Sequence, residues 1–320
     1  MSSPAASPAG KTAGALSPRR GRALVREIAQ RHFGEAPRRV EQRGGGLSNL
    51  VFEFHADGGD YIVRMHGDPG QLNRYLKEQW SMKAAREAGV PTPEVLEVDH
   101  HETGVPYMVS RKLDGVDASH HPERLPLLHE LGRLAAKVHT VRTQGYGRVF
   151  DWSSNQLSRC ARWADFLDQG WDVERCLAPL RKARLLTPVQ LKSLDETLHA
   201  MRGWRRPAVL NHGDLRLKNL VVLPDSAKVV ALIDWDEAVS APAPYWDLAI
   251  ALHDLNCDEK EAFLDGYGIT PQAYAKTLPF LRAINTVNYG RDVEQMLHRK
   301  DEARLGWYRA RLQGQFELSL

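Results

Sequence analysis

The sequence predicts an α+β protein built as two lobes, a small β-rich N-terminal lobe and a mainly helical C-terminal lobe. Two observations support this class. Short alternating segments, glycine-rich turns and few helices fill the chain up to residue 111, whereas helical periodicity dominates after Leu113-Asp114-Gly115. A length of 320 residues suits one large domain or a two-lobed one. We therefore divide the chain into a disordered tail (1–20), an N-lobe (21–111) and a C-lobe (112–320).

Local signals predict the elements of the N-lobe. Asp57-Gly58-Gly59-Asp60 is a hairpin turn between two alternating apolar segments. An apolar row at every fourth residue from Leu76 to Ala88 predicts a helix that Gly89 ends. In order, the expected elements are a helix at 21–33, strands at 50–54 and 61–65, a helix at 72–88, and strands at 94–99 and 106–110.

The C-lobe is predicted to be helical with one β interruption. Leu127, Leu131, Leu134, Ala135 and Val138 share one helical face. We expect further helices at 156–169, 187–202, 245–256, 258–266, 271–296 and 300–313. The interruption is a hairpin of 220–223 with 229–233, in a register that places Asn219 opposite Asp234.

Charge and cysteine content exclude several classes of protein. The chain carries a formal charge of +3, but its first 26 residues hold five basic residues and no acid. The remainder is net −2, which disfavours nucleic-acid binding because that needs a basic face. Three cysteines without metal spacing indicate a reducing compartment, so we expect a cytoplasmic protein, and no apolar stretch is long enough to span a membrane.

A cluster of oxygen-bearing side chains surrounds the predicted hairpin. Asp214 lies five residues before Asn219, and Asp234 ends the second strand. Asp214 can accept the proton of an attacking hydroxyl, and Asn219 and Asp234 offer the hard oxygen ligands that Mg²⁺ prefers. Phosphoryl transfer needs mainly such positioning and charge neutralisation. The sequence therefore predicts Asp214 as catalytic base and Asn219 with Asp234 as the metal ligands.

The N-lobe supplies candidate phosphate contacts. The turn around Gly45 and Gly46 lets the backbone approach phosphates and present N–H donors, and Ser48 or Asn49 can add a side-chain contact. Arg64 on the following strand can neutralise the phosphates. Glu78 on the next helix can pair with Arg64 and hold it in place.

These motifs together resemble a known family. The chain is similar to the aminoglycoside phosphotransferases, relatives of choline kinase within the protein-kinase-like fold, over about residues 40–270. The resemblance rests on His212-Gly213-Asp214 with Asn219, on Ile233-Asp234-Trp235-Asp236 and on Tyr245-Trp246-Asp247-Leu248-Ala249. The N-lobe matches more loosely, through Gly45-Gly46-Leu47-Ser48-Asn49, Tyr61-Ile62-Val63-Arg64, Glu78 and Ala88-Gly89-Val90-Pro91-Thr92-Pro93.

The resemblance implies a role for several residues. Ser110 to Lys112 would be the interlobe hinge that meets the adenine through backbone atoms, and Asp247 a buried brace for the catalytic loop. The implied cofactors are ATP, with GTP left open, and Mg²⁺. Arg216 and Lys218 depart from the usual family pattern, and they would touch phosphate or an anionic group of the substrate.

The expected activity is transfer of the γ-phosphate of ATP to a hydroxyl of a small molecule by a monomer or homodimer. An aminoglycoside or amino sugar is the first acceptor, which would associate the protein with antibiotic resistance; choline, ethanolamine, homoserine or a sugar is the alternative. A non-catalytic nucleotide-binding module stays open. A protein kinase is disfavoured because only twelve residues separate Asp234 from Asp247, too few for a peptide platform.

The acids after the catalytic region have two interpretations. They form either a solvated helix face or a rim that binds a cationic acceptor. The residues concerned are Asp254, Asp258, Glu259, Glu261, Asp265, Asp292 and Glu294.

Overall fold

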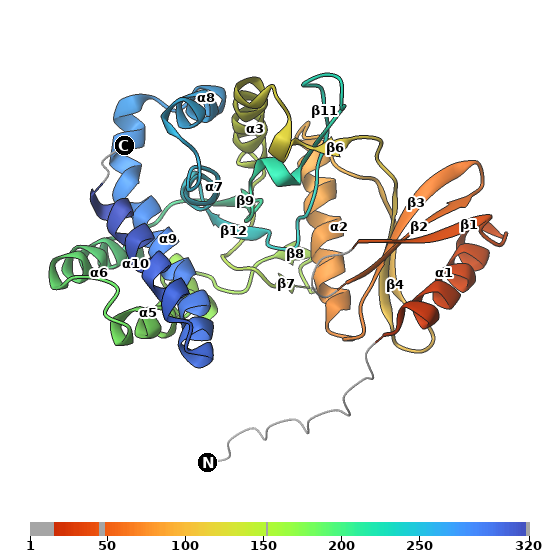
Figure 1. Cartoon of the computed structure of the whole chain (residues 1–320), viewed down its shortest axis with the longest axis horizontal. Helices are drawn as coiled ribbons and strands as arrows, with labels where there is room; N and C mark the ends of the chain where they lie inside the picture. Colours follow the sequence, from red (N-terminus) through yellow and green to blue (C-terminus); the bar gives the residue numbers. More distant parts are fainter. Residues whose placement is uncertain (1–15, 45–48, 152, 318–320) are drawn as a thin grey trace, which may run out of the picture. The chain divides into compact units, whose positions relative to one another are not determined.

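The computed structural model describes residues 16–44, 49–151 and 153–317 (Figure 1). The chain forms two compact units. The first comprises residues up to Leu76 together with Glu94–Lys112, and the second comprises Lys77–Pro93 and Leu113–Leu320. Sheet dominates the first unit and helix the second, which confirms the α+β class. The lobe limits at 21–111 and 112–320 stay a prediction. The two units do not follow these limits, because residues Lys77–Pro93 pack with the second unit.

The first unit is built on a five-stranded sheet of order β1-β2-β3-β5-β4 in which every neighbouring pair is antiparallel. The predicted hairpin and strand pair are confirmed, with slightly longer strands. Strand β1 was not predicted, because its residues are polar and mostly exposed. The strands are β1 (Arg39–Arg43), β2 (Leu50–Ala56), β3 (Gly59–Met65), β4 (Val95–His100) and β5 (Pro106–Arg111).

Helix α1 (Pro18–Phe33) supplies the core of the first unit. Ser17 caps it by accepting from the N–H of Arg20, and Gly34 ends it in the left-handed region. Its buried residues Leu24, Val25, Ile28 and Ala29 form one hydrophobic core with alternate residues of the sheet, among them Phe52, Phe54, Val63 and Val109. One face of the sheet is therefore covered by an apolar helix stripe.

The second unit is mainly helical. Two of its helices begin with capping boxes, formed by Thr187 and Gln190 at α6 and by Asn256 and Glu259 at α8. The helices are the C-terminal part of α2 (Gln71–Glu87), α3 (Arg124–Val138), α4 (Trp163–Asp165), α5 (Val173–Lys182), α6 (Pro188–Arg202), α7 (Tyr245–Ala251), α8 (Cys257–Tyr267), α9 (Pro271–Arg299) and α10 (Glu302–Glu317).

Short strands frame the catalytic segment in the second unit. β9 pairs with β12, and β10 pairs with both β11 and β6, each pair antiparallel. Bounds of these strands are β6 (Val116–Asp117), β7 (Phe150–Asp151), β8 (Gln156–Leu157), β9 (Ala208–Asn211), β10 (Leu220–Val222), β11 (Val229–Leu232) and β12 (Val239–Pro242).

Glycines let helices of the second unit pack at backbone contact. A Cβ on Gly132 of α3 would lie 2.1 Å from the carbonyl oxygen of Phe263 on α8. A Cβ on Gly266 of α8 would lie 1.9 Å from the carbonyl oxygen of His129 on α3. Each helix thus presents a glycine to the backbone of the other, so a side chain at either position would push the pair apart.

Several regions differ from the sequence predictions. A helix at 156–169 is wrong, because Gln156–Leu157 form β8 against β7 and only Trp163–Asp165 form an α-helical turn, followed by a π-helical turn at Phe166–Gly170. Helix α5 and strands β9 and β12 were missed. Both strands are buried at all four positions, so they lack the alternation that marks a half-exposed strand.

Among the described residues, none of the helices is both long and apolar enough to cross a bilayer.

Candidate active site

The catalytic loop after β9 is tied to the first turn of α7 by a buried carboxylate. Asp247 has no solvent exposure and accepts from the backbone N–H groups of His212 and Gly213, both at 2.8 Å. Nε2 of His139 lies 3.1 Å from the same carboxylate. Burial by itself raises the pKa of Asp247, but the contacts with His139 and the loop outweigh it and the pKa is lowered. Asp247 is therefore an ionised brace, as the resemblance implies.

His212 is a structural residue of this loop. It is fully buried, and burial lowers its pKa, so the ring is neutral. Its Nδ1 accepts from the N–H of Asp214 at 3.3 Å, which leaves Nε2 as the protonated nitrogen that donates to the carbonyl of Ile233 at 3.0 Å. A ring held in one tautomer by two backbone bonds positions the loop rather than exchanging protons with a substrate.

Asp214 is surrounded by donors. Nε of Arg216 lies 3.0 Å from one carboxylate oxygen, and Nζ of Lys218 lies 2.7 Å from the other. The amide of Asn219 donates to the backbone carbonyl of Asp214 at 2.7 Å and to its carboxylate at 3.2 Å. Burial raises the pKa of Asp214, but the hydrogen bond from Lys218 and the charge of Arg216 lower it by more. The carboxylate is therefore kept ionised, which a proton acceptor requires.

The hairpin register differs from the prediction by one residue. Leu220 pairs with Leu232 and Val221 with Ala231, so Asn219 faces Ile233 rather than Asp234. The N–H of Ile233 accordingly donates to the carbonyl of Asn219 at 2.9 Å. The difference arises at the turn, where Val222 pairs with Val229, two residues from its predicted partner Ala231, and the bulge between Val221 and Val222 reduces it to one residue. Asp234 follows next, in the left-handed region at φ 67°.

Asn219 and Asp234 fit a magnesium site. Because the Asn219 amide nitrogen faces two oxygens of Asp214, the amide oxygen is the atom left to bind a cation. Asp234 adjoins Asn219 through the Ile233 hydrogen bond and is half-buried. Within the described ranges no group of three or more His, Cys, Asp or Glu could hold a metal. Mg²⁺ does not need such a group, since one or two protein oxygens together with phosphates and waters complete its shell.

In the first unit, Tyr75 connects two of the predicted phosphate contacts. Its hydroxyl donates to the side-chain oxygen of Asn49 at 3.0 Å, and the guanidinium carbon of Arg64 lies 5.5 Å from the centre of its ring. Tyr75 is fully buried. Tyr75 was not predicted as a site residue, because its only sequence signal is its place in the first turns of the helix after Arg64. The predicted contacts Gly45, Gly46 and Ser48 lie outside the described residues.

Glu78 is buried, with 1% of its surface exposed, so it is not a surface helix residue. It belongs to the second unit and Arg64 to the first, and their pairing stays a prediction. Beside it, burial lowers the pKa of Lys77 to about 8 despite the nearby carboxylates of Glu237 and Asp236.

The predicted hinge is partly committed to other contacts. Nζ of Lys112 lies 2.9 Å from Glu53, and the N–H of Lys112 donates to the carbonyl of Asp60 at 2.9 Å. The N–H of Arg111 donates to Glu94 at 3.0 Å. An adenine contact by Ser110 or Lys112 therefore stays a prediction, and it would use backbone atoms other than these two N–H groups.

Most of the C-terminal acids have partners of their own. Asp254 pairs with Arg311, and Asp265 lies 3.3 Å from His129. Glu259 is buried, caps α8 and pairs with Arg124 at 2.7 Å. Asp292 accepts from Tyr308. These contacts favour structural roles over a shared rim for a cationic acceptor.

Comparison with known proteins identifies the chain's relatives. A family model described as phosphotransferase enzyme family matches residues 39–282. Hygromycin-B 4-O-kinase of Escherichia coli is 23% identical over 210 residues, covering 64% of this chain and 59% of that enzyme. Acyl-CoA dehydrogenase family member 10 of Mus musculus is 28% identical over 172 residues, covering 52% of this chain and 15% of that protein. The chain thus spans less than two thirds of either curated relative.

A solved structure shows the same fold. A thermostable mutant of aminoglycoside phosphotransferase APH(4)-Ia, in a ternary complex with AMP-PNP and hygromycin B, has a TM-score of 0.67 at 19% identity, covering 91% of this chain and 97% of that one. The family match includes the loop at 212–219, Asp234 and Asp247. The resemblance drawn from the motifs is confirmed: the chain belongs to the phosphotransferase enzyme family and has a protein-kinase-like fold.

Proposed function

We propose that this chain transfers the γ-phosphate of ATP to a hydroxyl of a small molecule. The observation that supports this best is the state of Asp214, an ionised carboxylate on a loop that Asp247 holds rigid. A solved neighbour of the same fold is a complex with the ATP analogue AMP-PNP, which supports a nucleotide donor.

In the proposed reaction, the acceptor oxygen attacks the γ-phosphorus while the bond to the ADP oxygen breaks. Asp214 accepts the hydroxyl proton as the new P–O bond forms. Arg216 and Lys218 are close enough to Asp214 to offset negative charge on the transferring group. Asn219 and Asp234 would hold Mg²⁺, which neutralises phosphate charge. Asn49 and Arg64, with the glycine turn and Ser48, would contact the phosphates, and Glu78 would position Arg64.

The reaction leaves open which hydroxylated molecule receives the phosphate. Two of the relatives are named for aminoglycosides, so an aminoglycoside or amino sugar is the first acceptor to test. Choline, ethanolamine, homoserine and simple sugars complete the panel. The remaining alternative, a non-catalytic nucleotide-binding module, predicts binding without turnover.

Turnover by the Asp214→Asn variant tests the mechanism. We expect ADP release with an accepted alcohol to fall by about 10²–10⁴-fold, the usual contribution of a general base, while nucleotide binding persists. The matched control is Asp225→Asn, an exposed aspartate in the turn after β10, which should keep wild-type turnover. Equal activity of Asp214→Asn and wild type with an accepted acceptor would show that Asp214 is not the base.

A further inference from the structure

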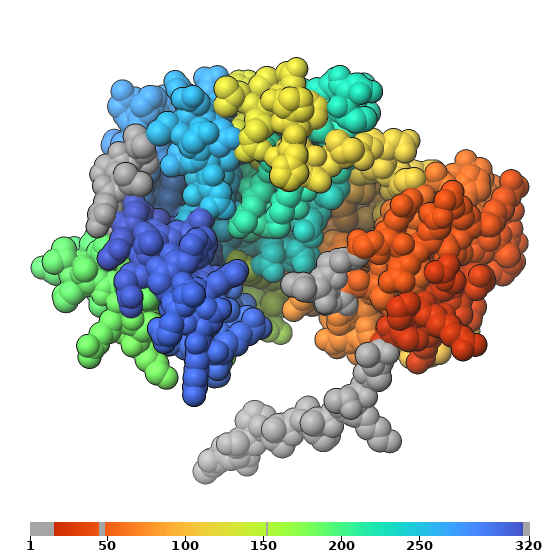
Figure 2. Space-filling model, viewed as in Figure 1, coloured from red at the N-terminus to blue at the C-terminus, as the bar shows by residue number. Residues whose placement is uncertain are grey.

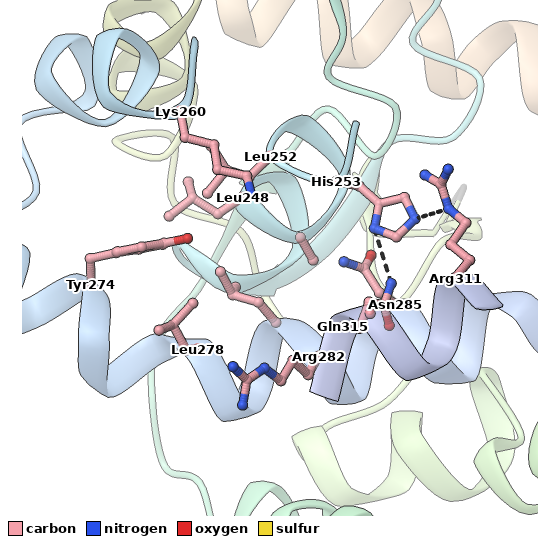
Figure 3. A pocket seen from close by; sticks show the side chains of 13 residues that line it. Leu248, Leu252, His253, Lys260, Tyr274, Leu278, Arg282, Asn285, Arg311 and Gln315 are labelled. Atoms are coloured by element: carbon pink, nitrogen blue, oxygen red, sulfur yellow. Dashed lines mark hydrogen bonds between the residues drawn. The ribbon is translucent and has the colours of Figure 1, made fainter. Parts of the chain in front are cut away.

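A hollow in the second unit is lined by helices α7, α8, α9 and α10 (Figure 3). Its volume is about 260 Å³, near the lower end for small-molecule sites. One part of its lining is apolar, with Leu248, Leu252 and Leu281 among the contributors. A ligand of this hollow would therefore be small and carry an apolar section.

The charged part of the lining is entirely basic. Lys260, Arg282 and Arg311 contribute to it, and no carboxylate does so among the residues that the structure describes. Arg311 is already paired with Asp254 outside the lining, whereas Lys260 forms no ion pair with any described residue. Lys260 extends from α8 toward Leu252 (Figure 3). Its ammonium group is thus placed at an apolar wall with nothing described to balance its charge.

The lowered pKa of His253 reflects, besides burial, the same excess of positive charge around the hollow. Burial and the charges of Arg311, Arg216 and Lys260, in that order, lower its pKa to about 3. The ring is therefore neutral, and Nε of Arg311 donates to its Nε2 at 2.8 Å. A site built to receive a polyamine would place carboxylates where these cations stand.

Two connections join the hollow to the catalytic loop. Leu248 and Ala249 line it directly after Asp247, whose carboxylate binds the N–H groups of His212 and Gly213. Arg216, which pairs with Asp214 at 3.0 Å, also lies within electrostatic range of His253 and Arg311. The hollow thus adjoins the helix that braces the loop of the proposed base.

We propose that the hollow binds the anionic group of the acceptor, a carboxylate or a phosphate, through Lys260, with the apolar part of the acceptor against α7. The inference rests on the proposed phosphotransfer and specifies its acceptor as an amphiphilic hydroxylated anion. It differs from the amino-sugar acceptor in the sign of the charge.

Four probes of one length test the charge. They are ω-hydroxyhexanoate, ω-hydroxyhexyl phosphate, ω-hydroxyhexanamide and ω-aminohexanol, measured by titration calorimetry against the full chain and by ADP release with Mg²⁺ and ATP. We expect at least one anionic probe to bind about tenfold or more tightly than the amide, the effect of one charge-assisted contact. The two anionic probes distinguish a carboxylate site from a phosphate site.

Substitutions at single residues test which side chain binds the anionic probe. Lys260→Gln should weaken binding of the anionic probe about tenfold and leave the amide unchanged. Lys260→Arg, which keeps the positive charge, should retain the preference for the anionic probe. Lys276→Gln, an exposed lysine on α9 outside the lining, is the control and should bind like wild type.

The outcomes separate this inference from the phosphotransfer itself. Binding of the anion that depends on Lys260, without ADP release for any alcohol, would keep the anion site and contradict the proposed reaction. Release of ADP with the amide, the amine or an aminoglycoside, without preference for an anion, would keep the reaction and overturn the anion site. Equal binding of all four probes, or of none, overturns it as well.

Discussion

At the scale of single residues, the chemistry depends on which charges are compensated. Asp214 is held by two cations and an amide, and Asp247 by two backbone N–H groups and a histidine. Lys260, in contrast, has no ion-pair partner among the described residues. Compensated charges build the catalytic loop, and the uncompensated one identifies where a ligand of opposite sign is expected.

His253 should make stability depend on pH. Its pKa is about 3 in the folded chain, against 6.5 for an ordinary histidine, so below pH 6.5 the unfolded chain binds a proton that the folded chain does not. Stability is therefore retained above pH 6.5 and lost as the pH falls toward 3. Between pH 7 and pH 5 we expect a loss of about 1–2 kcal/mol from this residue.

Urea denaturation of wild type and His253→Gln at both pH values measures this loss. The variant should show the smaller decrease between pH 7 and pH 5. His199→Gln, which alters an exposed histidine of α6, should keep the wild-type decrease. Identical decreases in all three proteins would mean that His253 takes up its proton as readily folded as unfolded.

Site residues that lie close together in the sequence could be predicted, whereas residues that only helix packing brings together could not. Asp214, Asn219 and Asp234 fall within a short segment, and their order along it was enough to name them. The register of Asn219 was wrong because the apolar pattern of the two strands does not fix where the turn between them lies. The set of Lys260, Arg282 and Arg311 comes from three helices, and only the packing of those helices brings it to one hollow.

At the scale of elements, substitution of glycine by alanine is predicted to have opposite effects on α3 and on α10. Gly132→Ala places a Cβ 2.1 Å from a backbone oxygen of α8, whereas Gly306→Ala on α10 meets nothing within 4 Å. We expect the first to destabilise the chain by about 1–3 kcal/mol through overpacking. The second should stabilise it by about 0.5–1 kcal/mol, because alanine loses less backbone entropy in a helix.

Denaturant midpoints of these two variants and of Gly266→Ala check the helix contact. Gly266→Ala should behave like Gly132→Ala, since its Cβ would lie 1.9 Å from the carbonyl oxygen of His129. Shifts of the same sign for Gly132→Ala and Gly306→Ala would contradict the close approach of α3 and α8.

Elements with local signals were predicted and those defined by distant partners were not. Helices α6 and α8 begin with capping boxes, and their predicted limits are within a residue or so of the observed ones. Strands β9 and β12 exist because each is the other's partner across about thirty residues of chain. Their sequences carry no alternation, so nothing local marks them as strands.

At the scale of the whole molecule, bound nucleotide should raise the melting temperature. A ligand at 100 times its dissociation constant stabilises the folded state by about 2.7 kcal/mol. We expect ATP with Mg²⁺ to shift the transition upward, and EDTA to remove much of the shift, because Asn219 and Asp234 would hold the metal that neutralises phosphate charge.

The variant Asp234→Asn should lose the Mg²⁺-dependent part of this shift, and Asp225→Asn should retain it. Differential scanning fluorimetry with ATP, with and without Mg²⁺, gives both quantities. An unchanged Mg²⁺-dependent shift in Asp234→Asn would remove Asp234 from the proposed metal ligands.

The division of the molecule was not predictable from periodicity. Residues 72–88 were expected to form one helix, and α2 is indeed continuous from Gln71 to Glu87. By packing, however, the helix is shared between the two units, with the change at Leu76 and Lys77. A periodic pattern indicates that a helix has a buried face, but it does not indicate which neighbouring elements cover that face.

Helix α7 also has a consequence for how this protein can change over generations. Its residue Asp247 sustains the catalytic loop, whereas most of the ligand-facing positions of the hollow are contributed by α8, α9 and α10. If the proposed function holds, mutations on those three helices would exchange one acceptor for another without removing the groups proposed to perform the transfer. Such a separation favours the appearance of new substrate ranges by a few substitutions, and it marks Lys260 as the first position to randomise in a directed-evolution library.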